Sequence, residues 1–293
     1  MEESIVLYND AFKKKNSKLW RLFKRKSEIY SIIIKAYQKC LISCRSEREN
    51  LLSHIEQDKC NMLKMRECAC LIQIGHYQEK IKNFNDAITT YSEICNDYWW
   101  FIDKPNKISY LEKISQLSFK INNFDNLAKI NLEIGDLFYN DEKLDMARQY
   151  YERAYNHSYG KYEIRYKIIL KLIEIYISIG EYSKAIERCI RILDDVVNYK
   201  KYISYVEIYD IHMYILLCFL CENKFEKYNK HFIHFCDLDL LNQDYYKMCS
   251  ELYQTYRNCD LEKFKDVCKD YNNDIYYNPI KTKLIQILKN QLD

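Results

Sequence analysis

Two groups of cysteine and histidine residues have spacings that could hold a metal ion. Cys218 and Cys221 are separated by two residues, as in one half of a zinc site. A second group, His231, His234 and Cys236, follows within one apolar-periodic segment. A structural zinc site needs four ligands, but no second cysteine pair matches the first, and only part of the histidine group can share a helix face. Because the first two cysteines fall in the most apolar segment, we interpret them as core residues and expect no metal and no cofactor.

The sequence offers no candidate set of catalytic residues. The carboxylates are scattered over faces expected to be solvated, and no nucleophile–base pair can be argued from their positions. The four glycines are too far apart to form a G-x-G-x-x-G or Walker A phosphate loop. We therefore expect a protein that is not an enzyme and has no small-molecule substrate. An enzyme that uses Cys or His is the third alternative that we consider for this chain.

The composition predicts uninterrupted helices. Only four glycines and two prolines occur in 293 residues, well below average usage, and all six lie between apolar-periodic segments. The net charge of +3 is too small to indicate a nucleic-acid partner. Thirteen cysteines without a secretory signal indicate reduced thiols and a cytoplasmic protein. The longest apolar run, Ile211 to Cys221, is too short to span a bilayer.

A short motif recurs along the first two thirds of the chain. An aromatic residue or leucine is followed three positions later by alanine or leucine, at Phe84–Ala87, Phe124–Leu127, Leu144–Ala147 and Tyr182–Ala185. Helices therefore recur about every 20 residues and hairpins about every 40, which is the spacing of a two-helix solenoid. We expect residues 1–200 to form a twisted right-handed solenoid of TPR-like helical hairpins.

The motif is absent after about residue 198, where a different arrangement is expected. Five helices are expected there, at Tyr205–Cys221, Phe225–Cys236, Gln243–Arg257, Leu261–Tyr271 and Pro279–Leu292. A last repeat without a neighbour would expose its apolar face to water. We therefore expect residues 201–293 to form a helical bundle that caps the solenoid, so that the chain is all-α.

A basic and aromatic segment, residues 16–26, lies between helices expected at Ser4–Lys15 and Glu28–Cys44. Its apolar side chains are Trp20, Leu22 and Phe23, and its basic ones include Lys24, Arg25 and Lys26. In one interpretation the aromatic rings pack against the first helices. In the other, they insert among lipid headgroups while each basic residue gains about 1 kcal/mol near an anionic surface.

Lys129 and Lys167 lie one repeat apart in equivalent contexts, each followed by isoleucine. Equivalent positions in successive repeats line up on one surface of a solenoid, so the two lysines could form a basic ladder. The alternative is two ordinary solvated lysines.

Several stretches together resemble the soluble NSF attachment proteins (SNAPs), the adaptors between SNARE bundles and the ATPase NSF. The resemblance covers essentially the whole length and is closest to the alpha/beta type, with the gamma type as an alternative. It rests on the order and spacing of the following segments: Ala128-Lys129 with Ile134-x-x-Leu137-Phe138, Met146–Glu152, Glu181–Ile186, Leu217–Cys221, Asp260-x-x-x-Phe264 and Lys283–Lys289.

The resemblance implies an adaptor with no catalytic site. Members of the family are solenoids with a C-terminal bundle; they lay a basic concave face along the acidic SNARE four-helix bundle and present their C-terminal end to the AAA ATPase. Lys129 and Lys167 match lysines implicated in SNARE contact. Trp20, Leu22 and Phe23 match the N-terminal membrane loop, here shortened and made basic by residues such as Lys24, Arg25 and Lys26. Leu292 matches the penultimate leucine that stimulates NSF.

The chain also departs from the family pattern at two places. Trp100 and Phe101 replace a lysine pair of the basic face, and Gln254, Arg257 and Asn258 replace an acidic cluster that faces NSF. Leu292 also has a simpler interpretation as a leucine at the edge of the core. We expect a SNARE-disassembly adaptor for vesicle-mediated transport, cytoplasmic and peripherally bound to membranes. The alternative is a generic TPR-like protein-interaction scaffold.

Overall fold

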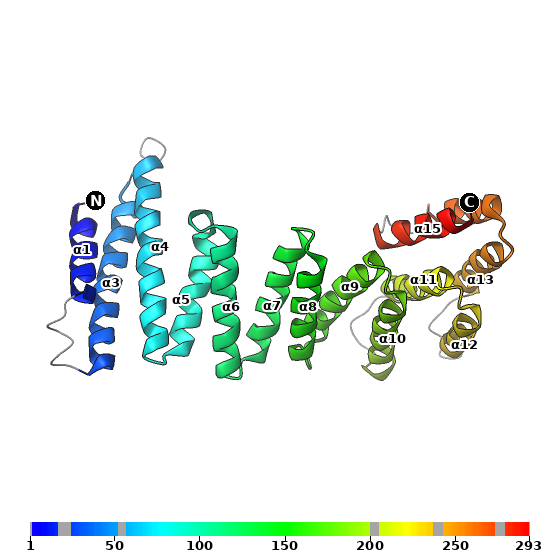
Figure 1. The fold of residues 1–293 in the computed structure, drawn as a ribbon, viewed down its shortest axis with the longest axis horizontal. Coiled ribbons are helices and arrows are strands. Elements are labelled where there is room, and N and C mark those ends of the chain that lie inside the picture. The colour runs from blue at the N-terminus through cyan, green and yellow to red at the C-terminus, as the bar shows by residue number, and fades with distance from the viewer. Residues whose placement is uncertain are drawn as a thin grey trace. The chain divides into compact units, whose positions relative to one another are not determined.

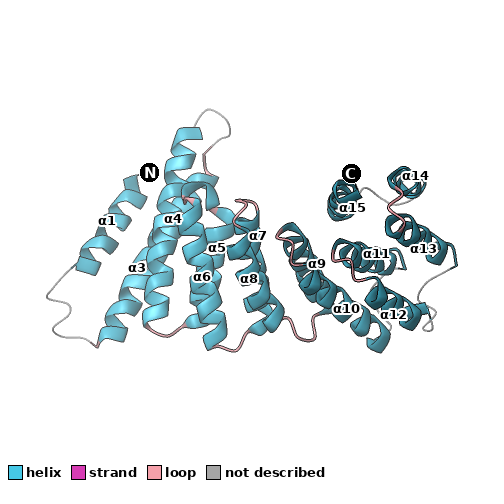
Figure 2. Cartoon of the chain, turned by 45° about the vertical axis from the view of Figure 1, so that its right-hand side comes forward, coloured by secondary structure: helices cyan, strands magenta, loops and turns pink. Residues whose placement is uncertain are grey.

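A computed structural model of the chain describes residues 2–16, 25–51, 57–199, 205–236, 243–272 and 279–292. This part contains fourteen α-helices and no β-strand, which confirms the all-α fold of TPR-like helical hairpins (Figures 1 and 2). The chain divides into two compact units, residues 1–143 and 144–293. These two units do not test the expected division into a solenoid (residues 1–200) and a bundle (residues 201–293), which stays a prediction.

The first unit is a row of helices in which each packs chiefly against the helices before and after it. It contains α1 (Glu2–Asn16), α3 (Lys26–Glu49), α4 (Gln57–Lys80), α5 (Phe84–Asp97), the 3-10 turn η1 (Trp99–Phe101), α6 (Lys104–Lys120) and α7 (Phe124–Tyr139). In α6 the buried residues Leu111, Ile114 and Leu117 recur at intervals of three, which places them in one stripe. The row confirms the expected helical hairpins.

A buried carboxylate joins three elements of the first unit. Glu67 of α4 is fully buried and accepts hydrogen bonds from Arg48 of α3 at 2.8 and 3.2 Å. The hydroxyl of Tyr98, the residue between α5 and η1, donates to the same carboxylate at 2.5 Å. Because both oxygens of Glu67 are paired, its burial does not leave an uncompensated charge.

The second unit continues with hairpins and ends in helices that surround α11. It contains α8 (Leu144–His157), α9 (Tyr162–Ser178), α10 (Tyr182–Tyr199), α11 (Tyr205–Cys221), α12 (Phe225–Cys236), α13 (Gln243–Arg257), α14 (Leu261–Asn272) and α15 (Pro279–Leu292). The last five helices begin at the expected residues. Positions 211–221 of α11 are all buried, because α10, α12, α13 and α15 pack around it.

Six helix–helix turns share one backbone geometry. In each, the residue two positions before the next helix has a positive φ of 54–76°; these residues are Lys82, Asn122, Glu142, Gly180, Asn223 and Cys259. The residue after it donates its N–H to the carbonyl five positions earlier, at 2.8–3.0 Å. This 6→1 bond is the signature of the Schellman motif. The helices that follow four of these turns begin at Phe84, Phe124, Leu144 and Tyr182, as the repeated motif predicts.

The described helices include no candidate transmembrane helix. None of them combines the length and the apolar content that a bilayer crossing needs.

Two histidines meet where α11 packs against α12. His212 is 3% exposed, and its ring centre lies 5.7 Å from that of His231. Burial lowers the pKa of His212 to about 3, and the neighbouring His231 adds to this effect. The folded state therefore holds His212 neutral at a pH where the unfolded chain takes up a proton.

This pair predicts a pH-dependent stability. The folded pKa of His212 lies below the ordinary histidine value of about 6.5, so the destabilising effect of this histidine is absent above about pH 6.5 and grows as the pH falls toward 3. We expect the free energy of unfolding to drop by about 2 kcal/mol between pH 6.5 and 5, measured by urea denaturation. His212→Phe should flatten this slope, whereas His157→Phe should leave it unchanged. If the His212→Phe variant lost stability with falling pH as steeply as the wild type, His212 would not be the group responsible.

Candidate functional site

Lys129 of α7 offers an unpaired positive charge. Its side chain is exposed, while the next residue, Ile130, is 8% exposed and faces the core. Glu133, one turn further on, is held by Lys107 of α6 at 3.0 Å. Within the described part of the chain no carboxylate pairs with Lys129. Its ammonium group is therefore available to an acidic partner.

Lys167 of α9 has the same local context but a neighbour of opposite charge. Ile168, the residue after it, is fully buried, and Lys167 is exposed. Its ammonium lies 3.0 Å from Glu163, one turn earlier, and both side chains are largely solvated. Such an exposed i,i+4 pair contributes only about 0.3–0.5 kcal/mol. The two lysines belong to different compact units, so the ladder that would join them stays a prediction.

The basic and aromatic segment is described only at its two ends, Asn16 and Arg25–Lys26. Trp20, Leu22, Phe23 and Lys24 lie outside the described residues. Arg25 has an extended backbone and precedes the first residue of α3. The side chains of Arg25 and Lys26 are both exposed. The proposed membrane contact of the aromatic rings therefore stays a prediction.

The C-terminal helix α15 is fixed by its inner face. Leu284 and Leu288 are fully buried, and the hydroxyl of Tyr256 in α13 donates to the side-chain carbonyl of Gln291 at 2.8 Å. Leu292 continues the stripe but is only half-buried. The last turn thus leaves part of this leucine accessible, and its role stays a prediction.

The cysteine and histidine groups do not assemble a metal site in the described residues. No cluster of three or more metal-ligating side chains occurs there. Cys218 and Cys221 are both buried; burial raises the pKa of Cys221 to about 12 and raises the pKa of Cys218 well above its ordinary value. Both thiols therefore stay protonated and serve as core residues. The side chains of His234 and Cys236 lie outside the described part.

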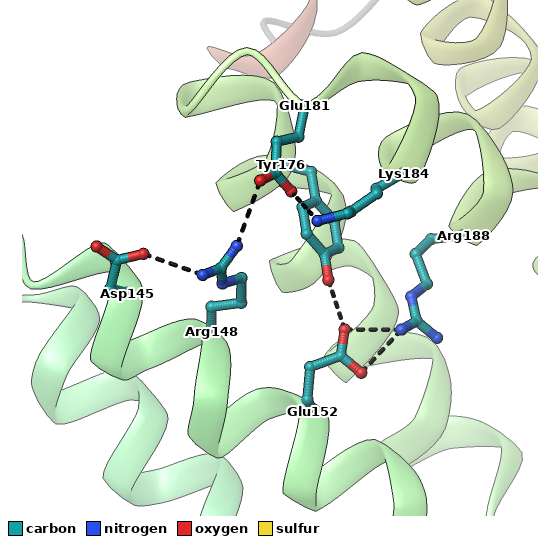
Figure 3. Close-up of polar contacts among 7 residues, drawn as sticks. All are labelled: Asp145, Arg148, Glu152, Tyr176, Glu181, Lys184 and Arg188. Atoms are coloured by element: carbon teal, nitrogen blue, oxygen red, sulfur yellow. Dashed lines mark hydrogen bonds and ion pairs between the residues drawn. The ribbon is translucent and has the colours of Figure 1, made fainter.

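A polar hollow in the second unit was not anticipated from the sequence. It has a volume of about 470 Å³ and is lined by Arg148, Gln149, Glu152, Arg153, Tyr176 and Lys184. Helices α8, α9 and α10 supply these side chains, and Figure 3 shows Arg148, Glu152, Tyr176 and Lys184 among them. Basic residues outnumber acidic ones in the lining, so the hollow suits a polar or acidic partner better than an apolar one.

Two separate sets of contacts hold side chains that line this hollow or lie beside it (Figure 3). Glu152 accepts two hydrogen bonds from Arg188 at 2.7 and 2.8 Å and one from the Tyr176 hydroxyl at 2.6 Å. Burial and this acceptor raise the pKa of Tyr176 to about 12, so it remains a donor. Glu181 pairs with Lys184 at 2.7 Å and with Arg148 at 3.5 Å. The contacts join three successive helices and contain no nucleophile–base pair.

Arg153 is the exception among the basic residues of the hollow. Its guanidinium lies over the Tyr150 ring, 4.9 Å from the ring centre, and within the described residues it has no carboxylate partner.

The sequence shows part of the contact set around Glu152, because Arg148–Glu152 in α8 and Lys184–Arg188 in α10 are both i,i+4 pairs. Their meeting across helices depends on helix rotation, which the pattern does not give.

The positions that depart from the family pattern are accessible. Trp100 is 72% exposed, and Phe101 is half-buried. In α13 and the turn after it, Gln254, Arg257 and Asn258 are exposed. The replacements therefore change the surface and not the core.

Comparison with solved structures gives distant helical-repeat proteins. A Podosopora anserina putative kinesin light chain with nearly identical TPR-like repeats is 10% identical over 75% of this chain and 91% of its own, with a TM-score of 0.34. A signal-transduction ATPase with a tetratricopeptide repeat sensor from Pyrococcus horikoshii is 13% identical over 99% and 50%, with a TM-score of 0.43. A Rap protein complexed with Competence and Sporulation Factor is 13% identical over 100% and 99%, with a TM-score of 0.34. We draw no functional conclusion from these likenesses.

Sequence comparison is more informative about the family. No curated protein matches the chain, but the family model "Soluble NSF attachment protein, SNAP" matches residues 61–293. This range runs from α4 to the last helix and thus covers hairpins of both units. The chain belongs to the soluble NSF attachment protein family.

Proposed function

We propose that this protein is an adaptor that binds assembled SNARE four-helix bundles and recruits an NSF-type AAA ATPase to disassemble them. The family match over residues 61–293 carries this proposal. SNAP-type and TPR-like scaffolds are generally non-enzymatic, and the exposed side chains of Lys129 and Lys167 could meet an acidic partner. The proposed setting is vesicle-mediated transport, with a cytoplasmic protein attached peripherally to membranes. Trp20, Leu22, Phe23, Lys24, Arg25 and Lys26 would form the membrane loop.

A capture experiment separates this function from that of a generic helical-repeat scaffold. The immobilised chain should retain an assembled SNARE bundle far better than single SNARE motifs, because only the bundle presents a continuous acidic surface. Equal retention of both would favour the scaffold.

The two lysines give the first variant for this assay. Lys129→Glu with Lys167→Glu should weaken bundle binding by at least about tenfold, because like charges placed opposite each other cost several kcal/mol. Both side chains are exposed, so the melting temperature should change little. Lys39→Glu with Lys227→Glu, which reverses one exposed lysine in each unit, is the matched control. Wild-type binding by the first variant would remove these lysines from the interface.

The membrane loop is tested with vesicles. Replacing Trp20, Leu22 and Phe23 by serine should reduce binding to anionic liposomes by more than about tenfold, because the aromatic anchors are lost while the basic residues remain. Disassembly of membrane-anchored bundles should slow, whereas disassembly of soluble bundles should keep its rate. Unchanged liposome flotation would instead support rings that pack against the first helices.

Leu292 is tested against its neighbour Leu288. Leu292→Ala should leave bundle binding and thermal stability nearly intact, because this side chain is only half-buried, but it should impair ATPase stimulation. Leu288→Ala removes a fully buried side chain and should cost about 2–5 kcal/mol of unfolding free energy. Normal stimulation by the Leu292 variant, measured as phosphate release by the cognate ATPase, would make Leu292 a packing residue.

A further inference from the structure

The C-terminal helix α15 has an apolar stripe that repeats at a constant interval. Leu284 and Leu288 are fully buried, and Leu292 follows after the same interval of four residues. Residues four apart lie on the same face of a helix. A shift of α15 by four residues along its axis, about 6 Å, would place Leu288 where Leu284 now packs and Leu292 where Leu288 packs. The leucines therefore define the inner face of this helix but not its register.

One charged residue lies within this stripe. Lys281 stands three residues before Leu284 and seven before Leu288, so it belongs to the same face of α15. Only 8% of its side chain is exposed, and its ammonium group forms an ion pair with Asp210 of α11, whose side chain is 29% exposed. The same ammonium group donates a hydrogen bond to that carboxylate. A lysine thus occupies a position of the inner face where its neighbours in the stripe are leucines.

The ion pair distinguishes the observed register from the shifted one. After a shift of four residues, Ile285 would face Asp210 in place of Lys281, and the carboxylate would lose its partner. A buried pair that loses one member leaves an uncompensated charge, which is strongly destabilising. Exchange of both members for apolar residues is often neutral or stabilising. Such a pair therefore acts on register more than on overall stability, as a single lysine does at a core position of a coiled coil.

Two other polar contacts of α15 discriminate less between the registers. Lys283 donates to the hydroxyl of Ser178 in α9 at 3.0 Å, and Gln291 accepts from the Tyr256 hydroxyl at 2.8 Å. On α15 both partners, Lys283 and Gln291, are exposed. Water can replace an exposed partner in a hydrogen bond at little cost. The buried contact of Lys281 is therefore the polar contact of α15 that a shift would penalise most.

The register decides what the last turn of α15 presents to a partner. In the observed register Leu292 is half-buried, so part of its side chain is accessible. In the shifted register it would occupy the position of Leu288, which is fully buried, and its apolar surface would be withdrawn. The accessibility of Leu292 therefore depends on a contact about three turns away, at the other end of the same helix.

We propose that the Lys281–Asp210 pair holds α15 in the register that keeps Leu292 accessible to the AAA ATPase. Lys281 and Asp210 are positioning residues, because they act on the partner only through α15. The register itself depends on contacts within the second unit, whereas its effect on an ATPase rests on the proposed function. The two parts are therefore tested by separate measurements.

The test compares three variants of the full chain. Lys281→Leu with Asp210→Leu, the apolar variant, removes both charges, whereas Lys281→Arg keeps the ion pair. Lys283→Leu with Ser178→Ala removes an exposed contact of the same helix and is the matched control. All three should melt within a few degrees of wild type, because none leaves an uncompensated buried charge. A large loss of melting temperature in the apolar variant would make the pair a stability element and overturn the proposal.

The register is measured by NMR of labelled methionine methyl groups. Leu292→Met, introduced into wild type and into each variant, adds one methyl group to the last turn of α15. This methyl group should give the same single resonance in wild type, in Lys281→Arg and in the control. The apolar variant should show a second or displaced resonance, because the shifted helix buries this group. A single resonance at the wild-type position in the apolar variant would overturn the proposal.

Phosphate release by the cognate ATPase measures the consequence for function. With two equally populated registers, the concentration of the apolar variant at half-maximal stimulation should rise about twofold, because only half of the molecules are competent. The maximal rate should be kept, since the ATPase selects the competent register, and Lys281→Arg should behave like wild type. Reduced stimulation with an unchanged methyl resonance would overturn the proposal. A displaced resonance with normal stimulation would support the register and contradict the proposed role of Leu292.

Discussion

Each helix of the first unit can bury its apolar stripe only against its sequence neighbours, so the close approach of successive helices is the constraint on which the structure depends. Gly75 lies inside α4 and not between helices as its sequence context predicted. It makes the approach of α4 and α5 possible, because a Cβ there would lie 2.7 Å from Cε1 of Tyr91. Tyr91 is fully buried and cannot move aside without disturbing the core. Ala87, Ala147 and Ala185 are likewise fully buried, in the small position of the repeated motif.

The helices of this fold and their buried faces can be predicted from the sequence, because they depend on residues that lie close together along the chain. Phe84 and Tyr182 begin helices where the motif places them, and Leu284 and Leu288, four residues apart in α15, are both fully buried. Cys218 and Cys221 are buried, as their place in the most apolar segment predicts. An apolar stripe at intervals of three and four residues specifies which side of a helix is inside, whatever its neighbours are.

The polar contacts between helices could not be read in the same way. Glu67 meets Arg48 and Tyr98 across distances of 19 and 31 residues, and their meeting depends on how far each helix is rotated and shifted. For Lys129 and Lys167 the sequence predicted exposure, which the structure confirms, but their alignment involves two units and stays a prediction.

The six shared turns have a consequence for how such a chain can change over time. In five of them the left-handed residue carries a side chain, at a strain of roughly 1–2 kcal/mol each. The turn is therefore specified by its main-chain hydrogen bonds, and glycine is dispensable there. Related proteins can therefore lose the turn glycines that are ordinarily used to align helical repeats, while the spacing between the turns stays the same. Divergence at these positions makes descent hard to trace by residue identity, and the spacing between turns becomes the more durable record of ancestry.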